Sequence, residues 1–169
     1  SVGIQAEPSE GAVKANVGSA GSDDTTSNPE NDNSGTTVQN VDAAASTAGG
    51  SGKGSFTLDN TGSADATLTA IALNSTTDTD ATAVNRNNNA RLSLLSPNTA
   101  LVTQNIPIDG TKRDFDTTVT LTAGEQEEFE FDRFRDSNGN QVDIRGESLT
   151  FTIYFADGST GNYTVTFPS

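Results

Sequence analysis

Apolar and polar residues alternate with a period of two along much of the chain beyond residue 55. In segment 128–131 two glutamates alternate with two phenylalanines, which is typical of a strand with one solvated and one buried face. The alternation is longest near the C-terminus, where one face carries Leu149, Phe151, Ile153 and Phe155. A turn at 156–161 and a second alternating stretch at 163–167 complete a predicted β-hairpin.

Several shorter strands are predicted before this hairpin. They lie at residues 56–58, 66–73, 91–95, 100–108 and 119–121. The apolar phase shifts within 66–73, which predicts a β-bulge, and 76–89 is expected to be a polar loop. No segment shows a convincing helical period. Short strands punctuated by turns therefore predict an all-β fold, an antiparallel β-sandwich over residues 53–169.

Residues 1–52 are expected to form a separate N-terminal part, made of two short strands and a polar arm. The apolar positions of the two alternating stretches are Val2, Ile4, Val13, Ala15 and Val17. From Gly18 to Gly54 the chain is mostly Gly, Ser, Thr, Asn, Asp and Ala. Such a segment buries too little apolar surface to offset an ordering cost of about 1–2 kcal/mol per residue. We expect an extended arm, with N-terminal strands that pair with their own domain or add to a neighbour's sheet edge.

The charge of the chain narrows its range of partners. It has 23 Asp and Glu against nine Lys and Arg, a net charge of −14 and a pI of about 4.1. Nucleic acids and anionic membranes are therefore not expected partners. Many carboxylates with few lysines suit a high-salt environment, where a Debye length of about 3 Å at 1 M screens self-repulsion. An ordinary acidic secreted protein is the alternative.

The composition also argues against catalysis. The chain has no His and no Cys, which removes imidazole and thiol chemistry and the usual transition-metal sites. The densest carboxylate group consists of Glu125, Glu127, Glu128 and Glu130. Paired carboxylates can hydrolyse glycosides, but these are expected to line a solvated strand face. The nearby arginines are Arg133, Arg135 and Arg145, expected to pair with these carboxylates or to lie at a subunit interface. We expect neither an enzyme nor a bound cofactor.

Oxygen-bearing side chains gather in segment 136–143. The candidate ligands for a hard cation such as Ca²⁺ are Asp136, Asn138, Asn140 and Asp143. Glycine falls fourth in this loop, whereas an EF-hand loop has it sixth. Asn138-Gly139 is also a strong signal for a type I′ turn. We favour the turn and keep the metal site as a weak alternative.

Several features predict a secreted or cell-surface protein. Acceptor motifs for N-glycosylation begin at Asn74 and Asn162. The chain begins at Ser1 rather than Met, as expected of a processed protein, and has no apolar run of 18 residues, so no membrane span is expected. The outward residues of the C-terminal hairpin are Thr150, Thr152 and Tyr154; they could bind a sugar or a partner, although a plain solvent face is the simpler expectation.

Two sequence segments resemble a known class of extracellular module. Ser55–Leu73, reading SFTLDNTGSADATLTAIAL, resembles the paired strands of secreted Ig-like β-sandwich modules of archaea and bacteria. Leu121–Phe131, reading LTAGEQEEFEF, is similar to a later strand of these modules, and Phe134–Phe155 with its hairpin partner resembles the end of haloarchaeal pilin-like domains. The resemblance covers residues 53–169. It implies an Ig-like sandwich with an adhesive or filament-forming role, and it carries over no catalytic residues.

Type IV pilins polymerise through a long apolar N-terminal helix, which these residues do not include. Our first hypothesis is therefore a subunit of an extracellular, pilus-like filament or surface layer, in which an N-terminal strand completes the sandwich of a neighbouring copy. If a helix was removed, the chain is instead the soluble head of a type IV-like pilin. The further alternatives are a monomeric adhesion module that binds glycans or neighbouring cells, and a coat or spike component of a halophilic virus.

Overall fold

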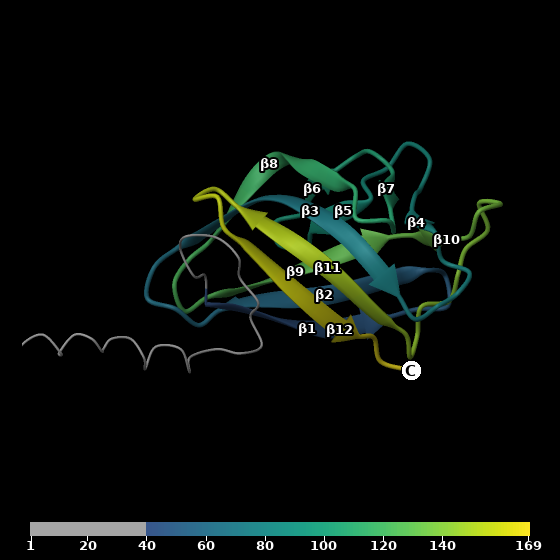
Figure 1. The fold of residues 1–169 in the computed structure, drawn as a ribbon, viewed down its shortest axis with the longest axis horizontal. Coiled ribbons are helices and arrows are strands. Elements are labelled where there is room, and N and C mark those ends of the chain that lie inside the picture. Colours follow the sequence, from purple (N-terminus) through teal and green to yellow (C-terminus); the bar gives the residue numbers. More distant parts are fainter. Residues whose placement is uncertain (1–39) are drawn as a thin grey trace, which may run out of the picture. The chain divides into compact units, whose positions relative to one another are not determined.

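Hydrogen bonds join twelve strands into three sheets in residues 40–169, the part of the chain that the computed structural model describes (Figure 1). In chain order the strands are β1 (Val41–Ala48), β2 (Lys53–Asn60), β3 (Ala66–Thr76), β4 (Ala83–Val84), β5 (Leu92–Leu94), β6 (Thr99–Val102), β7 (Ile106–Pro107), β8 (Lys112–Leu121), β9 (Gln126–Asp132), β10 (Phe134–Arg135), β11 (Ser148–Phe155) and β12 (Thr160–Thr166). These residues contain no helix. The predicted all-β fold is confirmed.

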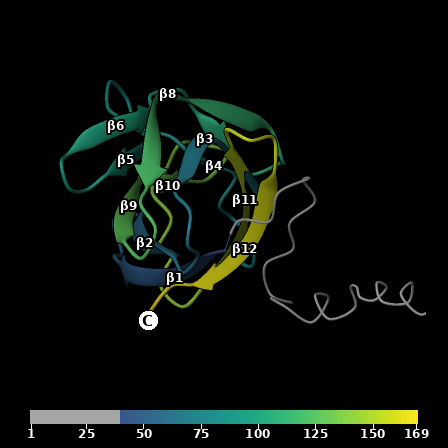
Figure 2. The same ribbon diagram turned by 90° about the vertical axis from the view of Figure 1, so that its left-hand side faces the viewer.

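Two large antiparallel sheets pack face to face as a sandwich. One has the strand order β1-β2-β9-β5-β6 and the other β12-β11-β3-β8, while a small third sheet has the order β10-β4-β7. Seen end-on in Figure 2, the strands of the two large sheets surround a common interior. At the two sides of the sandwich, β1 lies beside β12 and β6 lies beside β8.

The predicted alternation places phenylalanines in the interior. The inward residues of β11 are all buried, and so are Phe129 and Phe131 of β9. Phe56 of β2 stacks on both of these rings, with centroids 5.2 and 5.1 Å apart, and meets Phe151 across the sandwich at 4.9 Å. Burial of each ring stabilises the fold by about 1.5–3 kcal/mol, so this cluster joins the two sheets.

The phase shift predicted within 66–73 is a β-bulge. The pairing of β3 with β8 slips between Leu68 and Ala70, and its pairing with β11 slips at the same place. The side chain of Thr69, the extra residue, donates a hydrogen bond to the carbonyl of Tyr154 at 3.1 Å. The bulge changes which residues of β3 face the core, as expected of an inserted residue.

The prediction of a polar arm over 18–54 is wrong for its last part, from residue 41 onward. Strand β1 forms there and pairs with β2 along its whole length, so the sandwich begins at residue 41 rather than 53. Val41 is fully buried and Ala43, Ala45 and Ala48 pack against the core. The sequence pattern did not reveal this strand, because its inward residues after Val41 are alanines, which are less apolar than the large residues that mark the other strands. The interface residues expected in strands, Val2, Ile4, Val13, Ala15 and Val17, lie outside the described residues.

Two further boundaries differ from the sequence prediction. The expected loop 76–89 contains β4, which pairs with β7 and β10. The single strand expected at 100–108 is divided into β6 and β7, which belong to different sheets. Pairing partners distant in the sequence decide such short strands, and local alternation does not reveal them.

Candidate functional site

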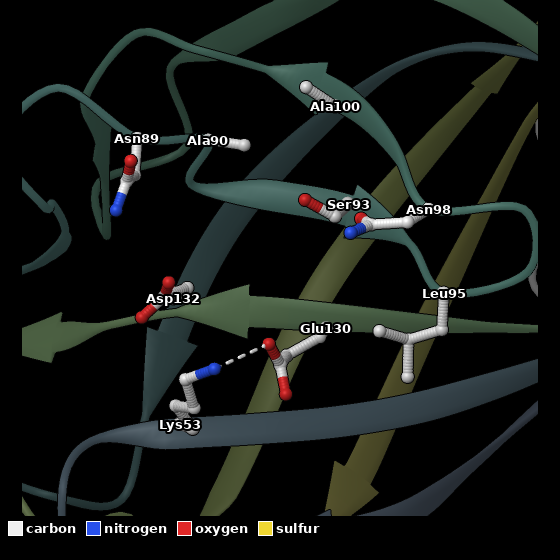
Figure 3. Close-up of a pocket in the computed structure, with 9 residues that line it drawn as sticks. All are labelled: Lys53, Asn89, Ala90, Ser93, Leu95, Asn98, Ala100, Glu130 and Asp132. Carbon is white, nitrogen blue, oxygen red and sulfur yellow. Dashed lines mark hydrogen bonds and ion pairs between the residues drawn. The ribbon is translucent and has the colours of Figure 1, made fainter.

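A groove of about 420 Å³ lies on the outer face of the five-stranded sheet (Figure 3). It crosses β2, β9 and β5 and reaches the turn before β6. Its lining residues are Lys53, Asn89, Ala90, Ser93, Leu95, Asn98, Ala100, Glu130 and Asp132. The alternation that turns Phe129 and Phe131 inward turns Glu130 and Asp132 outward into this groove.

Charges in the groove are paired. The ammonium of Lys53 donates a hydrogen bond to Glu130 Oε1 at 2.9 Å, as Figure 3 shows. Asp132 accepts hydrogen bonds from Arg86 at 2.7 Å and from Arg133 at 3.0 Å. Because each carboxylate already has a cationic partner, the groove suits a neutral, hydrogen-bonding ligand better than a second ion.

The uncharged part of the groove is lined by neutral hydrogen-bonding groups and one apolar side chain. Asn89, Asn98 and Ser93 supply amide and hydroxyl groups, and each can donate and accept hydrogen bonds. Leu95 is 36% exposed and is the large apolar side chain that the described residues leave on the surface. Sequence reasoning did not single out these four residues, because they come from β5 and from the loops before and after it and share no local pattern.

The four glutamates singled out from the sequence lie on β9 or directly before it. Glu128 and Glu130 lie on the outer face of β9, as predicted, and Ser55 donates a hydrogen bond to Glu128 at 3.2 Å. Glu127 also lies in β9, and Glu125 lies in the turn before it, exposed to solvent. Glu128 and Glu130 thus have separate hydrogen-bond partners on this strand face, Ser55 and Lys53.

The three arginines expected to pair with these glutamates pair elsewhere. Arg133 contacts Asp132, and Arg145 binds Asp143 at 2.5 Å. Arg135 donates to two backbone carbonyls, of Asn85 at 2.5 Å and Gly139 at 2.7 Å. The expectation of glutamate partners is therefore wrong, because β10 and the loops around it turn these guanidinium groups toward nearer acceptors.

The loop 136–140 is a turn, but not of the predicted type. Type I′ needs a positive φ at both central residues, and here Gly139 alone has one, at 87°. The amide of Gly139 donates to the carbonyl of Asp136, whose own amide donates to Asn140, each at 3.0 Å. This is the three-residue loop in which glycine occupies the left-handed position.

The Asp136 carboxylate caps this loop. It accepts hydrogen bonds from the amides of Asn138 and Asn140, both at 2.8 Å, and from the side chain of Asn140 at 2.9 Å. These bonds, chiefly those from Asn140, lower the pKa of Asp136. The fourth candidate ligand, Asp143, is held by Arg145, which lowers its pKa to about 2. Within residues 40–169, no three Asp or Glu side chains come close enough together to hold a metal ion.

The outward face of the four-stranded sheet is a ladder of hydroxyl and amide groups. Thr152 accepts a hydrogen bond from Asn74 at 2.9 Å and donates one to Asn162 at 2.6 Å. Thr150 bonds to Thr164 at 2.9 Å on the same face. Lys112 lies 4.9 Å above the ring of Tyr154. The two glycosylation motifs therefore meet at one threonine, with Asn162 exposed on β12 and Asn74 half-buried on β3.

β12 carries a buried hydroxyl group, that of Tyr163. Tyr163 is 6% exposed, and its hydroxyl has no hydrogen-bond partner among the described residues. Its ring packs on Phe151 with centroids 5.7 Å apart. Alternation predicted a buried side chain here, but only the tertiary structure shows that its hydroxyl lacks a hydrogen-bond partner.

Comparison with known proteins does not supply a relative: neither a family model nor a curated protein matches this chain. In residues 40–169 no helix is long and apolar enough to cross a membrane.

Proposed function

We propose that the protein is a structural, non-catalytic subunit of an extracellular filament or cell-surface assembly. Copies are joined when the N-terminal strand of one completes the sandwich of the next. The observation that carries the proposal is that the two large sheets of the described sandwich, residues 41–166, end in strands that pair with no further described strand on their outer side. The alternating stretches at 2–6 and 13–17 lie outside the described residues, and we propose that they supply the donated strand.

The open edges of the sandwich support the same proposal. The large sheets end at β1, β6, β8 and β12, and the outer edge of an end strand presents unpaired N–H and C=O groups. An extended segment can add to such an edge through main-chain hydrogen bonds. Copies joined head to tail in this way form an open filament when the rotation between successive copies does not close a ring.

The length of the connecting segment permits this exchange. Residues 18–40 follow the second alternating stretch and, fully extended, span at most about 80 Å. The longest strand, β3, has 11 residues and is about 37 Å long. The segment is therefore long enough to extend beyond its own sandwich to that of a neighbour.

Deletion of residues 1–17 tests the proposal. The truncated protein should keep the far-UV circular dichroism spectrum of a folded sandwich, yet appear as single particles by negative-stain microscopy and light scattering. Replacement of residues 19–35 by a Gly/Ser segment of equal length is the matched control and should still form filaments, since it keeps the reach of the arm. Filaments of the first variant would show that strand donation is wrong.

A glycan-binding adhesion module is the second candidate, and the polar groove favours it. Neutral groups of Ser93 and Asn98 beside Leu95 are suited to a sugar. In that case the full chain should stay monomeric, and calorimetry should detect its binding of oligosaccharides. Asn98→Ala should weaken that binding, whereas Thr150→Ala, on the opposite sheet, should leave it unchanged.

A further inference from the structure

The fold treats the two acceptor motifs for N-glycosylation differently. One motif begins at Asn74 in β3 and the other at Asn162 in β12, and the 169 residues contain no further Asn-x-Ser/Thr triplet. Both asparagines lie on the outer face of the four-stranded sheet, where each is hydrogen-bonded to Thr152. The two motifs can therefore be compared within one sheet.

Asn74 is confined by neighbouring segments. It is half-buried on β3, an inner strand that lies between β11 and β8. Its Nδ2, the atom to which a sugar would be attached, donates a hydrogen bond to Thr152 at 2.9 Å. The loop before β8 is also close, since a Cβ atom added to Gly110 would lie 3.9 Å from Asn74 Oδ1. An oligosaccharide on this nitrogen would have to displace its surroundings, both during enzymatic transfer and in the folded protein.

Asn162, by contrast, is open to an attached sugar. It lies on β12, the end strand of its sheet, and both Asn162 and Thr164 are exposed on the outward face. Oδ1 of Asn162 accepts a hydrogen bond from Thr152 at 2.6 Å, while its Nδ2 has no hydrogen-bond partner among the described residues. Because alternation turns Tyr163 inward, the amide and the hydroxyl that define the motif reach solvent side by side.

The outer face around Asn162 suits a carbohydrate. Thr152 lies opposite Asn162 in the pairing of β11 with β12, and Thr150 lies opposite Thr164 beside them. Their hydroxyls can donate hydrogen bonds to a sugar and accept them from it. Tyr154 is the diagonal neighbour of Asn162 on the same face, at a separation that an aromatic side chain spans. Its ring offers an apolar surface that ends in a hydroxyl.

We propose that Asn162 carries an N-linked oligosaccharide and that Asn74 carries none. This inference rests on the extracellular location in the proposed function, because the motif is glycosylated in secreted chains. In the reaction, Nδ2 of Asn162 attacks the anomeric carbon of a lipid-linked oligosaccharide. The new C–N bond replaces the C–O bond to the lipid phosphate, which leaves with the electron pair while Nδ2 gives up one proton.

A sugar at Asn162 covers one face of the sandwich and leaves the other open. It projects from the outer face of the sheet β12-β11-β3-β8, whereas the groove that contains Ser93 and Glu130 lies on the five-stranded sheet. The glycan therefore adds a hydrophilic cover to the hydroxyl ladder without closing the groove.

Peptide mass spectrometry of the protein secreted by its native organism tests the inference. Trypsin separates the two motifs, because cleavage after lysine and arginine places Asn74 in peptide 54–86 and Asn162 in peptide 146–169. Peptide 146–169 should exceed its polypeptide mass by that of an oligosaccharide, whereas peptide 54–86 should have its polypeptide mass.

Variants expressed in the same organism identify the attachment site. Asn162→Gln should reduce the intact protein to its polypeptide mass, while the matched control Asn74→Gln should keep the full increment. Thr164→Val should also lose the increment, since it removes the hydroxyl of the motif but keeps a β-branched residue in β12. An unchanged increment in Asn162→Gln would place the sugar on a serine or threonine hydroxyl and overturn the inference.

Two further results would also overturn it: an unmodified peptide 146–169, or a sugar on peptide 54–86. If the unmodified protein still forms filaments, the proposed function stands without the modification. If the modified protein never assembles, the filament proposal fails and the modification site remains.

Discussion

Asn60 ends β2, and its side chain holds the turn that leads to β3. It is 1% exposed, and its Nδ2 donates hydrogen bonds to the carbonyls of Leu121 at 2.8 Å and Ala64 at 2.9 Å. Its Oδ1 accepts a hydrogen bond from the amide of Gly62 at 3.0 Å. One amide group thus joins the β2–β3 turn to the end of β8, and Asn60→Ala removes all three bonds.

The expected loss of stability follows from these contacts. Each hydrogen bond contributes about 1 kcal/mol net, and the buried carbonyl of Leu121 is left without this donor. Ala64 is exposed and Gly62 is half-exposed, so water can replace part of what they lose. We expect the free energy of unfolding to fall by about 3 kcal/mol, and the melting temperature by about 10 °C.

Urea denaturation followed by far-UV circular dichroism measures this loss, since the chain has no tryptophan for fluorescence. The matched control is Asn98→Ala, an exposed asparagine in a turn, which should change the free energy of unfolding by less than about 0.5 kcal/mol. A loss below about 1 kcal/mol for Asn60→Ala, at an unchanged slope with denaturant, would refute the structural role of this side chain.

Three further predictions concern packing, pH and salt. Gly54→Ala should cost about 1–3 kcal/mol in chemical denaturation, because the new Cβ would lie 2.8 Å from the ring of Phe167, whereas Gly49→Ala meets no atom closer than 3.9 Å and should be neutral. The folded state holds the pKa of Asp143 at about 2, below its ordinary 3.8. The ionised form therefore stabilises the protein above pH 4, and this contribution disappears as the pH falls through 2; melting curves of Asp143→Asn should show a smaller decline over that range. Finally, a net charge of −14 should lower the melting temperature when salt falls from molar to millimolar, and an unchanged value would contradict the high-salt hypothesis.

Alternation predicted the strands whose inward residues are large. Segment 149–155 and its partner strand need no tertiary information, because branched and aromatic residues at every second position form one apolar face. The bulge in β3 was visible for the same reason, as a break in that alternation. Strand β1 was missed because alanine and serine are also common in linkers, so hydrophobicity alone does not distinguish a strand rich in them from a linker.

The candidate sites were less accessible to sequence reasoning. The groove joins Lys53 to Glu130 and Asn98, which are far apart along the chain, and only the order β2-β9-β5 brings them together. The arginines after β9 illustrate the same limit, since Arg135 donates to the carbonyl of Asn85, 50 residues away. Hydrogen bonds of this kind depend on the three-dimensional path of the backbone, which residue type alone does not specify.

By itself, then, the sequence determined the fold class, the buried faces of the long strands and the acidic character of the surface. These are properties of local alternation and composition, which do not depend on which strands become neighbours. The tertiary structure decided that β1 belongs to the sandwich, that β12 lies beside it without hydrogen bonds, and that Tyr163 is buried there without a partner. Such features arise from contacts between distant segments, and so they appear only when the two sheets are packed together.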